Sequence, residues 1–329
     1  MINKILANLY LIGYSIDRII HIFSQVETSF TVISVGNITA GGAGKSTFTS
    51  FIVERLLSYG LNPVIVSRGY KAIIKKNCLV PPNADPIKYG DEPVMLRESC
   101  NVPVLIGKRR EKSIINWSKK YPESIFIMDD GFQYYRLKRD LNIVLIDSTE
   151  PFENYRLIPK GHAREPLWAL KRADCIVLTR AEIVERSRLE YLKGVIRGIS
   201  EKIPIFEAET VIKCWKNALY KRVERPEMGN AFCAIGNPKA FKKLLEMEDI
   251  KLNSFKIYDD HHNYSYHDFK ENTYRKEKYI CTEKDIVKIR RFLNDDEKRN
   301  FIFPKITFSV SNEFLIWFAS RIMRRELGR

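Results

Sequence analysis

A glycine-rich segment that ends in Gly44-Lys45-Ser46 constrains this chain more than any other stretch. An apolar, β-branched run (31–35) precedes it, and a helical pattern (48–57) follows it. Strand, glycine-rich turn, Gly-Lys-Ser and helix together are the layout of a phosphate-binding loop. In such a loop, backbone amides and the N-terminus of the helix surround phosphate oxygens. The sequence therefore predicts a chain that binds and spends a nucleoside triphosphate.

The candidate nucleotide-binding residues run from Thr39 to Thr47. Within them, Lys45 is expected to reach the β- and γ-phosphates, and the Ser46 hydroxyl is expected to bind Mg²⁺. Thr39 stands where the strict pattern G-x-x-x-x-G-K-[ST] places its first glycine. A surface glycine turn followed by an ordinary lysine is the alternative, but the strand before and the helix after favour the phosphate loop. The full set is Thr39, Ala40, Gly41, Gly42, Ala43, Gly44, Lys45, Ser46 and Thr47.

Further apolar segments alternate with helical patterns along the first two thirds of the chain. They lie at 63–67, 102–106, 124–128, 142–146 and 175–179. Nearly continuous apolar strands are typical of a parallel sheet that helices cover on both faces, so we expect a doubly wound, mostly parallel α/β fold. In such sheets the functional residues gather at the carboxyl ends of the strands.

The length and the pattern together predict two domains after an N-terminal helix. We expect the helix at 1–24, the phosphate-loop domain at 25–210 and a smaller α/β domain at 211–329. In the smaller domain, 231–235 and 278–281 resemble strands and 239–247 resembles a helix. The C-terminal segment 312–329 is amphipathic and suits packing on either domain.

Composition narrows the range of partners without choosing one. The net charge of +15 favours anionic partners, which are nucleic acid, acidic lipid or a phosphorylated substrate. None of the six cysteines forms a C-x-x-C pair, so zinc-finger and redox motifs lack support and free thiols in a reducing cytoplasm are expected.

Apolar residues recur at helical spacing through 1–24. The longest unbroken apolar run, 9–14, is far shorter than the roughly 20 residues that span a bilayer. From the residues alone, two interpretations stay open: a helix packed on the core of the protein, or a helix lying in a membrane interface.

Three acidic or histidine-containing segments are candidates for chemistry. Asp129 and Asp130 follow a strand, where a carboxylate commonly anchors Mg²⁺, although a helix cap is the alternative. Asp91, in Gly-Asp-Glu-Pro, is by itself typical of a helix start. The run 259–262, Asp-Asp-His-His, suits either a proton shuttle or a polar turn, and its spacing differs from the helical zinc motif. A basic loop, 156–166, suits an anionic substrate or plain solvation.

Taken in order, these segments resemble the tetraacyldisaccharide 4′-kinase family of lipid A synthesis. The resemblance covers nearly the whole chain and includes threonine at the place of the first loop glycine. It rests on the N-terminal apolar helix and on the segments 35–45, 67–70 (Ser-Arg-Gly-Tyr), 90–93 (Gly-Asp-Glu-Pro), 129–133 (Asp-Asp-Gly-Phe-Gln), 156–159, 164–167, 236–238 (Gly-Asn-Pro), 260–262 (Asp-His-His) and 282–285 (Thr-Glu-Lys-Asp).

The resemblance implies a kinase that moves the γ-phosphate of ATP to the 4′-hydroxyl of a tetraacylated glucosamine disaccharide 1-phosphate. It implies that Asp91 is the base for that hydroxyl and that His261, which directly follows an aspartate, pairs with it. Closing of the cleft between the domains would bring the two together. Ser46, Asp129, Asp130 and Glu165 would hold Mg²⁺.

A lipid substrate also implies a membrane location. The helix at 1–24 would lie in the cytoplasmic interface of the inner membrane, and basic residues would contact anionic lipid and the substrate's 1-phosphate. We expect neither nucleic acid nor an obligate protein partner. Several departures from the family pattern are mild: Ala43 and Ser46 where threonine is usual, and Phe132 where leucine is common. A further departure, Gly-His-Ala at 161–163, leaves a substrate role for His162 open.

Two other classes compete with this interpretation. A metal-insertion GTPase usually carries Asn-Lys-x-Asp after a late strand, and 178–182 lacks it. A basic nucleic-acid-binding ATPase would bind DNA or RNA in a salt-dependent way, and it gives no reason for an apolar N-terminal helix.

Overall fold

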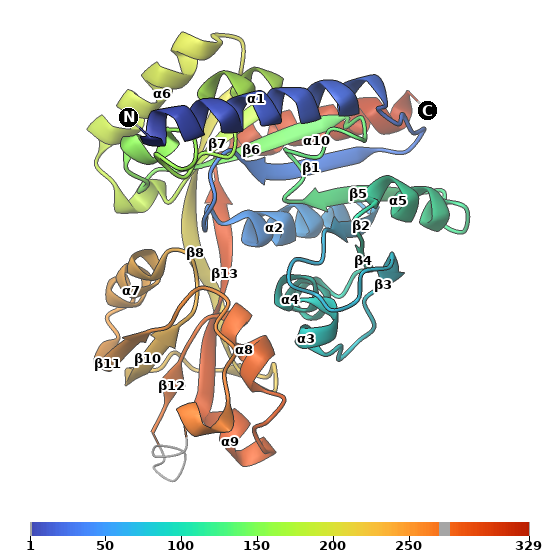
Figure 1. Ribbon diagram of the computed structural model, residues 1–329. Coiled ribbons are helices and arrows are strands. Elements are labelled where there is room, and N and C mark those ends of the chain that lie inside the picture. The colour runs from blue at the N-terminus through green and yellow to red at the C-terminus, as the bar shows by residue number, and fades with distance from the viewer. Residues whose placement is uncertain (1, 270–276, 329) are drawn as a thin grey trace.

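One large sheet runs through the computed structural model, which describes residues 2–269 and 277–328 (Figure 1). Its strands follow the order β11-β10-β12-β13-β8-β7-β6-β1-β5-β2-β4-β3, and β9 pairs with β8. Adjacent strands are parallel except in the pairs β8–β13, β8–β9 and β3–β4. The prediction of a mostly parallel α/β sheet is therefore confirmed. The strands are β1 (Val32–Asn37), β2 (Asn62–Ser67), β3 (Cys78–Leu79), β4 (Val104–Ile106), β5 (Ser124–Asp129), β6 (Leu141–Asp147), β7 (Cys175–Thr179), β8 (Ile205–Asn217), β9 (Arg222–Val223), β10 (Met228–Cys233), β11 (Lys251–Ile257), β12 (Tyr279–Ile280) and β13 (Phe301–Val310).

Helices cover both faces of the sheet. Side chains of α2, α4 and α10 share one core with Ile33 and Val35 of β1, and side chains of α6 share another with Val144 and Ile146 of β6. The central strands β1, β5, β6 and β7 are buried along their whole length, which explains why their sequences are almost uniformly apolar. The helices are α1 (Ile2–Phe23), α2 (Lys45–Ser58), α3 (Pro86–Tyr89), α4 (Asp91–Cys100), α5 (Arg110–Ser118), α6 (Arg186–Ile199), α7 (Pro238–Met247), α8 (Glu283–Ile289), α9 (Asp295–Asn300) and α10 (Asn312–Leu327), with 3-10 turns at Phe152–Tyr155, Leu167–Arg172, Ala181–Ile183 and Tyr266–Asp268.

The long strands β8 and β13 join the two halves of the molecule. They pair antiparallel from Ala208–Val310 to Asn217–Ile302, and both extend across the upper and lower halves in Figure 1, in opposite directions. β8 continues the parallel strands of the phosphate-loop half, whereas β13 continues the parallel strands β12, β10 and β11. The domain boundary that we expect near residue 210 therefore falls inside a shared strand.

The C-terminal helix α10 packs on the phosphate-loop half. Phe314 and Phe318 are fully buried, and they belong to the same core as Phe48 and Phe51 of α2. The second half has its own smaller cores, one beneath α8 and one beneath α7. As a result, the chain crosses into the second half along β8 and returns along β13.

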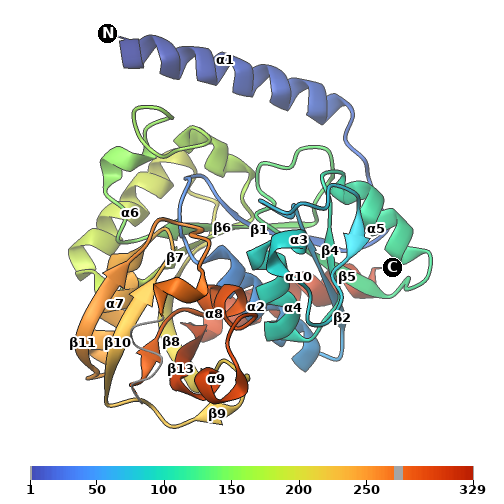
Figure 2. The same cartoon turned by 60° about the horizontal axis from the view of Figure 1, so that its bottom comes forward.

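The helix α1 stands off the main body (Figure 2) and is attached through its polar side. Tyr10 donates a hydrogen bond to the Arg164 carbonyl (2.8 Å), and Tyr14 donates one to Glu165 Oε2 (2.9 Å). A second row of side chains is apolar and more than half exposed, namely Leu9, Ile12, Ile16, Ile19, Ile20 and Phe23. At 100° per residue, this row lies away from the two tyrosines. Among the helices within residues 2–269 and 277–328, none combines the length and the apolar character needed to cross a bilayer.

Candidate active site

The glycine-rich segment forms a loop at the carboxyl end of β1, in the middle of the sheet. Gly41 and Gly44 have φ angles of 130° and 82°, which side chains rarely adopt, and α2 begins directly after the loop at Lys45. Thr39 is buried and pairs with Ala163, and the Ala40 amide donates to the His162 carbonyl (2.6 Å). The loop therefore has the position and the backbone conformation that a phosphate site requires.

Lys45 lies across this loop. Its Nζ donates to Asn37 Oδ1 (3.0 Å) and to the Gly41 carbonyl (3.4 Å), and it lies 3.7 Å from Asp130 Oδ1. Ser46 and Thr47 follow in the first turn of α2 and are half-buried. The cation and the two hydroxyls thus lie where a bound triphosphate needs them.

Asp129 ends β5 beside the first turn of α2. Ser46 donates to its Oδ2 (3.3 Å) and Thr49 donates to its Oδ1 (3.0 Å). Burial raises the pKa of Asp129 to about 7, and the negative charges of Glu92 and Asp130 add to this effect. A buried carboxylate beside a phosphate-loop hydroxyl supplies the oxygen ligands that Mg²⁺ prefers.

Asp130 is balanced by cations. Arg164 donates to both of its carboxylate oxygens (2.9 and 2.8 Å), and it also donates to Asn37 Oδ1 (2.6 Å). Burial alone would raise the pKa of Asp130, but Lys45 and Arg164 outweigh it and hold the pKa well below its usual range. Asp130 therefore links the phosphate loop to the basic loop that contains Arg164.

Glu165 lies in a different cluster from its neighbour Arg164. Its carboxylate is fully buried, and Oε2 accepts hydrogen bonds from Tyr14 (2.9 Å), Tyr135 (2.9 Å) and Arg172 (2.7 Å). In the part of the chain that the structure describes, no group of three or more His, Cys, Asp or Glu side chains is arranged to hold a metal ion. The structure thus does not bring Glu165 into a preformed metal site with Asp129 and Asp130, and its observed contacts tie α1 to the sheet.

Asp91 and His261 meet although 170 positions separate them in the sequence. His261 Nδ1 lies 2.9 Å from Asp91 Oδ2, and the amide of Glu92 donates to Asp91 Oδ1 (3.0 Å). Both side chains are largely buried, at 9% and 13% exposed. Burial opposes ionisation of Asp91, but the hydrogen bond from His261 and the charge of Lys284 lower its pKa to about 2. Asp91 is therefore a carboxylate at neutral pH.

The backbone on both sides of this pair is unusual. Gly90 has a φ of 92°, and a Cβ built there would come within 2.9 Å of the Tyr70 carbonyl, so only glycine fits before Asp91. His261 itself has a φ of 63°, an uncommon conformation for a residue with a side chain. The helix start predicted at Asp91 is present, since α4 begins there. One residue thus begins a helix and contacts the histidine.

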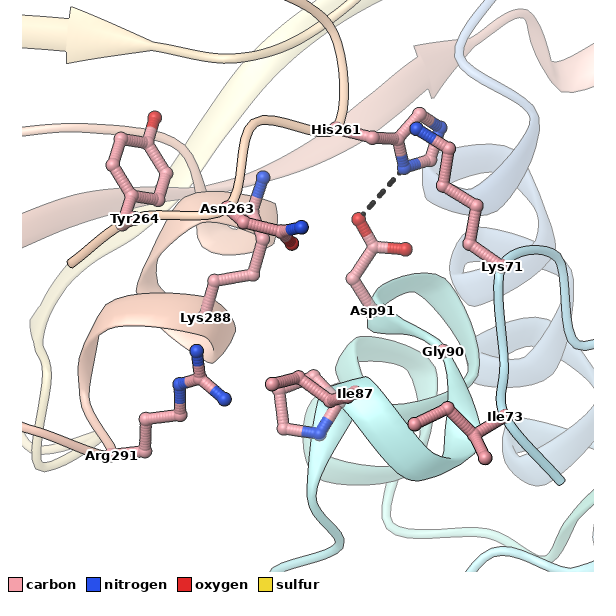
Figure 3. Close-up of a pocket in the computed structure, with 11 residues that line it drawn as sticks. Lys71, Ile73, Ile87, Gly90, Asp91, His261, Asn263, Tyr264, Lys288 and Arg291 are labelled. Carbon is pink, nitrogen blue, oxygen red and sulfur yellow. Dashed lines mark hydrogen bonds and ion pairs between the residues drawn. The ribbon is translucent and has the colours of Figure 1, made fainter.

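A cavity of about 440 Å³ opens beside the pair (Figure 3). Asp91 and His261 lie on its wall, and Lys71 reaches toward the histidine ring in this view. Lys288 and Arg291 add positive charge, while Ile73 and Ile87 supply apolar surface. The cavity suits a ligand that carries a negative charge and some apolar surface.

The other two histidines of these segments have different surroundings. The His262 ring stacks on Tyr258, with 4.6 Å between ring centroids. His162 Nδ1 lies 2.9 Å from Glu150, and its carbonyl accepts the Ala40 amide. Between His261 and His262, only His261 contacts Asp91, and His162 supports the phosphate loop through its backbone.

Residues of the second half also approach the phosphate loop. Asn237 donates to Asp147 Oδ2 (3.2 Å) at the end of β6, and its backbone nitrogen lies 3.4 Å from a Cβ built at Gly42. From the phosphate-loop half itself, Arg180 after β7 donates to the Gly42 carbonyl (2.6 Å). Lys284 of α8 binds Glu92 Oε1 (3.2 Å) and His261 Nε2 (3.3 Å). The sequence analysis assigned no role to Lys284. The segment Thr-Glu-Lys-Asp that contains it could have drawn attention to it, but the cap that Thr282 provides for α8 already explains that segment structurally.

Comparison with known proteins agrees with this geometry. A family model described as Tetraacyldisaccharide-1-P 4′-kinase matches residues 2–323. The chain is 32% identical to a tetraacyldisaccharide 4′-kinase of Halothermothrix orenii, over 94% of this chain and 87% of that protein. It is 34% identical to another from Syntrophus aciditrophicus, over 82% and 78%. It also resembles the crystal structure of LpxK from Aquifex aeolicus in complex with ATP, with a TM-score of 0.78, 28% identity and 99% of each chain covered.

Proposed function

We propose how these residues carry out the reaction of the family to which this chain belongs, the tetraacyldisaccharide-1-P 4′-kinases. The chain is a kinase that transfers the γ-phosphate of ATP to the 4′-hydroxyl of tetraacyldisaccharide 1-phosphate in lipid A biosynthesis. The observation that carries the residue assignment is the 2.9 Å contact between Asp91 and His261. Asp91 comes from the phosphate-loop half and His261 from the second half.

ATP binds with its phosphates in the loop from Thr39 to Gly44. The loop amides and the N-terminus of α2 hold phosphate oxygens, and Lys45 moves its ammonium from Asn37 onto the β- and γ-phosphates. Ser46 and Thr47 add hydroxyl groups at the start of α2. The negative charge of the triphosphate is thereby neutralised on the protein side.

Ser46 and Asp129 would hold Mg²⁺, because their hydroxyl and carboxylate are hard oxygen donors and lie 3.3 Å apart. Asp130 is the second carboxylate of this proposed site. We do not assign Glu165 to it, because an arginine and two tyrosines bind its Oε2, although its buried Oε1 has no hydrogen-bond partner within the described residues. When bound, the metal ion neutralises charge that develops on the β- and γ-phosphates.

Asp91 receives the proton of the sugar hydroxyl. As the 4′-oxygen forms its bond to the γ-phosphorus, the bond from phosphorus to the β,γ-bridging oxygen breaks and ADP leaves. The hydroxyl proton passes to the Asp91 carboxylate. Each carboxylate oxygen has two acceptor sites, so the contacts with His261 and the Glu92 amide leave room for the hydroxyl. His261 keeps Asp91 ionised and oriented.

The cavity beside Asp91 receives the sugar end of the lipid. Lys71 and Arg291 lie on its wall, where their charges suit an acceptor that carries a phosphate. The apolar row of α1 lies in the cytoplasmic interface of the inner membrane, since an exposed apolar face of this size favours a lipid surface over water. The enzyme then binds its lipid substrate without removing the whole lipid from the membrane.

Transfer of labelled γ-phosphate from ATP to tetraacyldisaccharide 1-phosphate in mixed micelles tests the reaction. The expected result is a bisphosphorylated lipid that forms with Mg²⁺ and does not form with EDTA. ATP binding without transfer would contradict the proposed acceptor. Transfer that survives EDTA would contradict the proposed metal site.

A further inference from the structure

Lys284 contacts His261 at Nε2, the ring nitrogen that faces away from Asp91. Its Nζ lies 3.3 Å from His261 Nε2, 3.2 Å from Glu92 Oε1 and 3.6 Å from Asp260 Oδ1. The side chain is only 14% exposed. The lysine therefore joins His261 to Glu92, whose charge in turn acts on Asp129 at the phosphate loop.

The amine of Lys284 is charged at neutral pH. Burial lowers the pKa of a lysine, but here the carboxylates of Glu92, Asp91 and Asp260 outweigh burial and raise it. An ammonium group has three N–H donors and no acceptor. In the contact with His261, Lys284 is therefore the donor and Nε2 is the acceptor.

That contact determines where the histidine proton lies. An Nε2 that accepts a hydrogen bond carries no proton, so the neutral ring must carry its proton on Nδ1. Nδ1 faces Asp91 Oδ2 at 2.9 Å, and the Nδ1–H can donate to that carboxylate.

The remaining groups around His261 fit the same arrangement. Asp260, on the same loop, lies 3.9 Å from Nε2, and the Tyr70 ring lies 5.3 Å from the imidazole ring between centroids. Asp260 attracts a proton to the ring, but it also contacts Lys284, which partly neutralises it. Asp91 on α4 and Lys284 on α8 are thus the two groups that hydrogen-bond the two ring nitrogens.

We propose that Lys284 is a positioning residue that holds His261 as the neutral Nδ1–H tautomer and so directs its N–H at Asp91. The inference rests on the proposed role of the Asp91–His261 pair. With a neutral histidine, Asp91 accepts one hydrogen bond and remains basic enough to take the hydroxyl proton. With an imidazolium, a full positive charge would face Asp91 and weaken it as a base.

The test compares Lys284→Met, which removes the charge and the donor at similar length, with Lys284→Arg, which keeps both. The matched control is Lys305→Met. Lys305 is also a buried lysine at this boundary, but it contacts Ser99 and Glu283 rather than the pair. Long-range ¹H–¹⁵N spectra of histidine-labelled protein report the tautomer, and His261→Asn identifies its signals among the five histidines of the chain.

In the wild type and in Lys284→Arg, we expect His261 with a protonated Nδ1 and a bare Nε2. In Lys284→Met, we expect mixed tautomers, because the group that donates to Nε2 is gone. At neutral pH, kcat should fall on the order of 10- to 100-fold, the loss typical of groups that orient a functional imidazole, with KM for ATP unchanged. Lys305→Met should change none of these.

Two results would overturn the inference. One is a wild-type His261 protonated at Nε2, a result that does not depend on the folding of either Lys284 variant. The other is a His261 tautomer that is the same in Lys284→Met as in Lys305→Met, which would make the lysine merely structural. Failure of the proposed function looks different, because the wild type would then transfer no phosphate whatever tautomer His261 adopts.

Discussion

Replacement of Asp91 by asparagine is the sharpest test of the proposed chemistry. Asparagine keeps the shape of the side chain and can still contact His261, but it cannot take a proton from the sugar hydroxyl. The amide also suits the first turn of α4, where Asp91 stands after Gly90. The substitution therefore removes the base while it leaves the backbone and the helix start in place.

The size of the effect follows from two separate contributions. Loss of a general base costs about 10²- to 10⁴-fold in rate, which corresponds to roughly 3 to 5 kcal/mol of activation free energy. The lowering of the Asp91 pKa from 3.8 to about 2 corresponds to roughly 2 kcal/mol of folding free energy. Since the folded pKa is depressed, this stability is present above pH 4 and is lost as the pH falls toward 2. This stability contribution should therefore be constant between pH 5 and pH 8.

The assay is the micelle transfer of labelled phosphate, with ATP binding measured by calorimetry and stability by urea unfolding. Asp85→Asn is the matched control. Asp85 lies six positions upstream, caps α3 through the Ile87 amide (3.0 Å), and accepts the same substitution without loss of a cap. We expect Asp85→Asn to keep its turnover, and Asp91→Asn to lose turnover with ATP affinity preserved.

The reasoning fails if Asp91→Asn retains a tenth or more of wild-type turnover, because no general base would then have been removed. It also fails if Asp91→Asn and Asp85→Asn lose turnover equally, since the effect would then follow from this stretch of chain rather than from the carboxylate. A loss of ATP binding in Asp91→Asn would point to the phosphate loop instead of the acceptor.

Three further outcomes are expected. Ile12→Glu with Ile16→Glu should reduce co-sedimentation with anionic vesicles several-fold while far-UV circular dichroism stays the same, because both side chains lie in the exposed row of α1; unchanged sedimentation would remove the membrane role. Ser46→Ala should raise the Mg²⁺ concentration for half-maximal turnover, and a midpoint equal to that of the wild type would exclude the hydroxyl as a ligand. Glu165→Gln should lower the urea-unfolding free energy by about 3 kcal/mol, because Arg172 would lose its buried partner; a loss of Mg²⁺ affinity at unchanged stability would instead restore Glu165 to the metal site.

The sheet could be predicted where strands are buried on both faces. β1, β5, β6 and β7 are continuous apolar runs, and their positions agree with the sequence pattern to within one or two residues. β8 and β13 were not anticipated. Most of β8 is only half-buried, so its sequence mixes charged and apolar residues and lacks a continuous run. Of the two strands that join the halves, β8 therefore carries a weak pattern, whereas β13 is mostly buried.

The candidate active-site residues also differ in how far their contacts could be predicted from the sequence. The phosphate loop is contiguous, so its geometry follows from one stretch of sequence. The contact of Asp91 with His261 is long-range, and only the family resemblance indicated it before the structure did. Arg164 and Glu165 are sequence neighbours whose side chains enter different clusters, one at Asp130 and one at Tyr135. No sequence spacing distinguishes those two environments.

Because the two halves share strands, the proposed catalytic pair of Asp91 and His261 forms when the protein folds. β8 and β13 are continuous across the boundary, and Asp91 and His261 are already in contact in this structure. Bringing together two residues 170 positions apart restricts the chain by roughly 5 kcal/mol of closure entropy. That restriction is met once, when the polypeptide folds, instead of at every turnover. Under the proposed function, each incoming lipid therefore meets Asp91 and His261 already in contact.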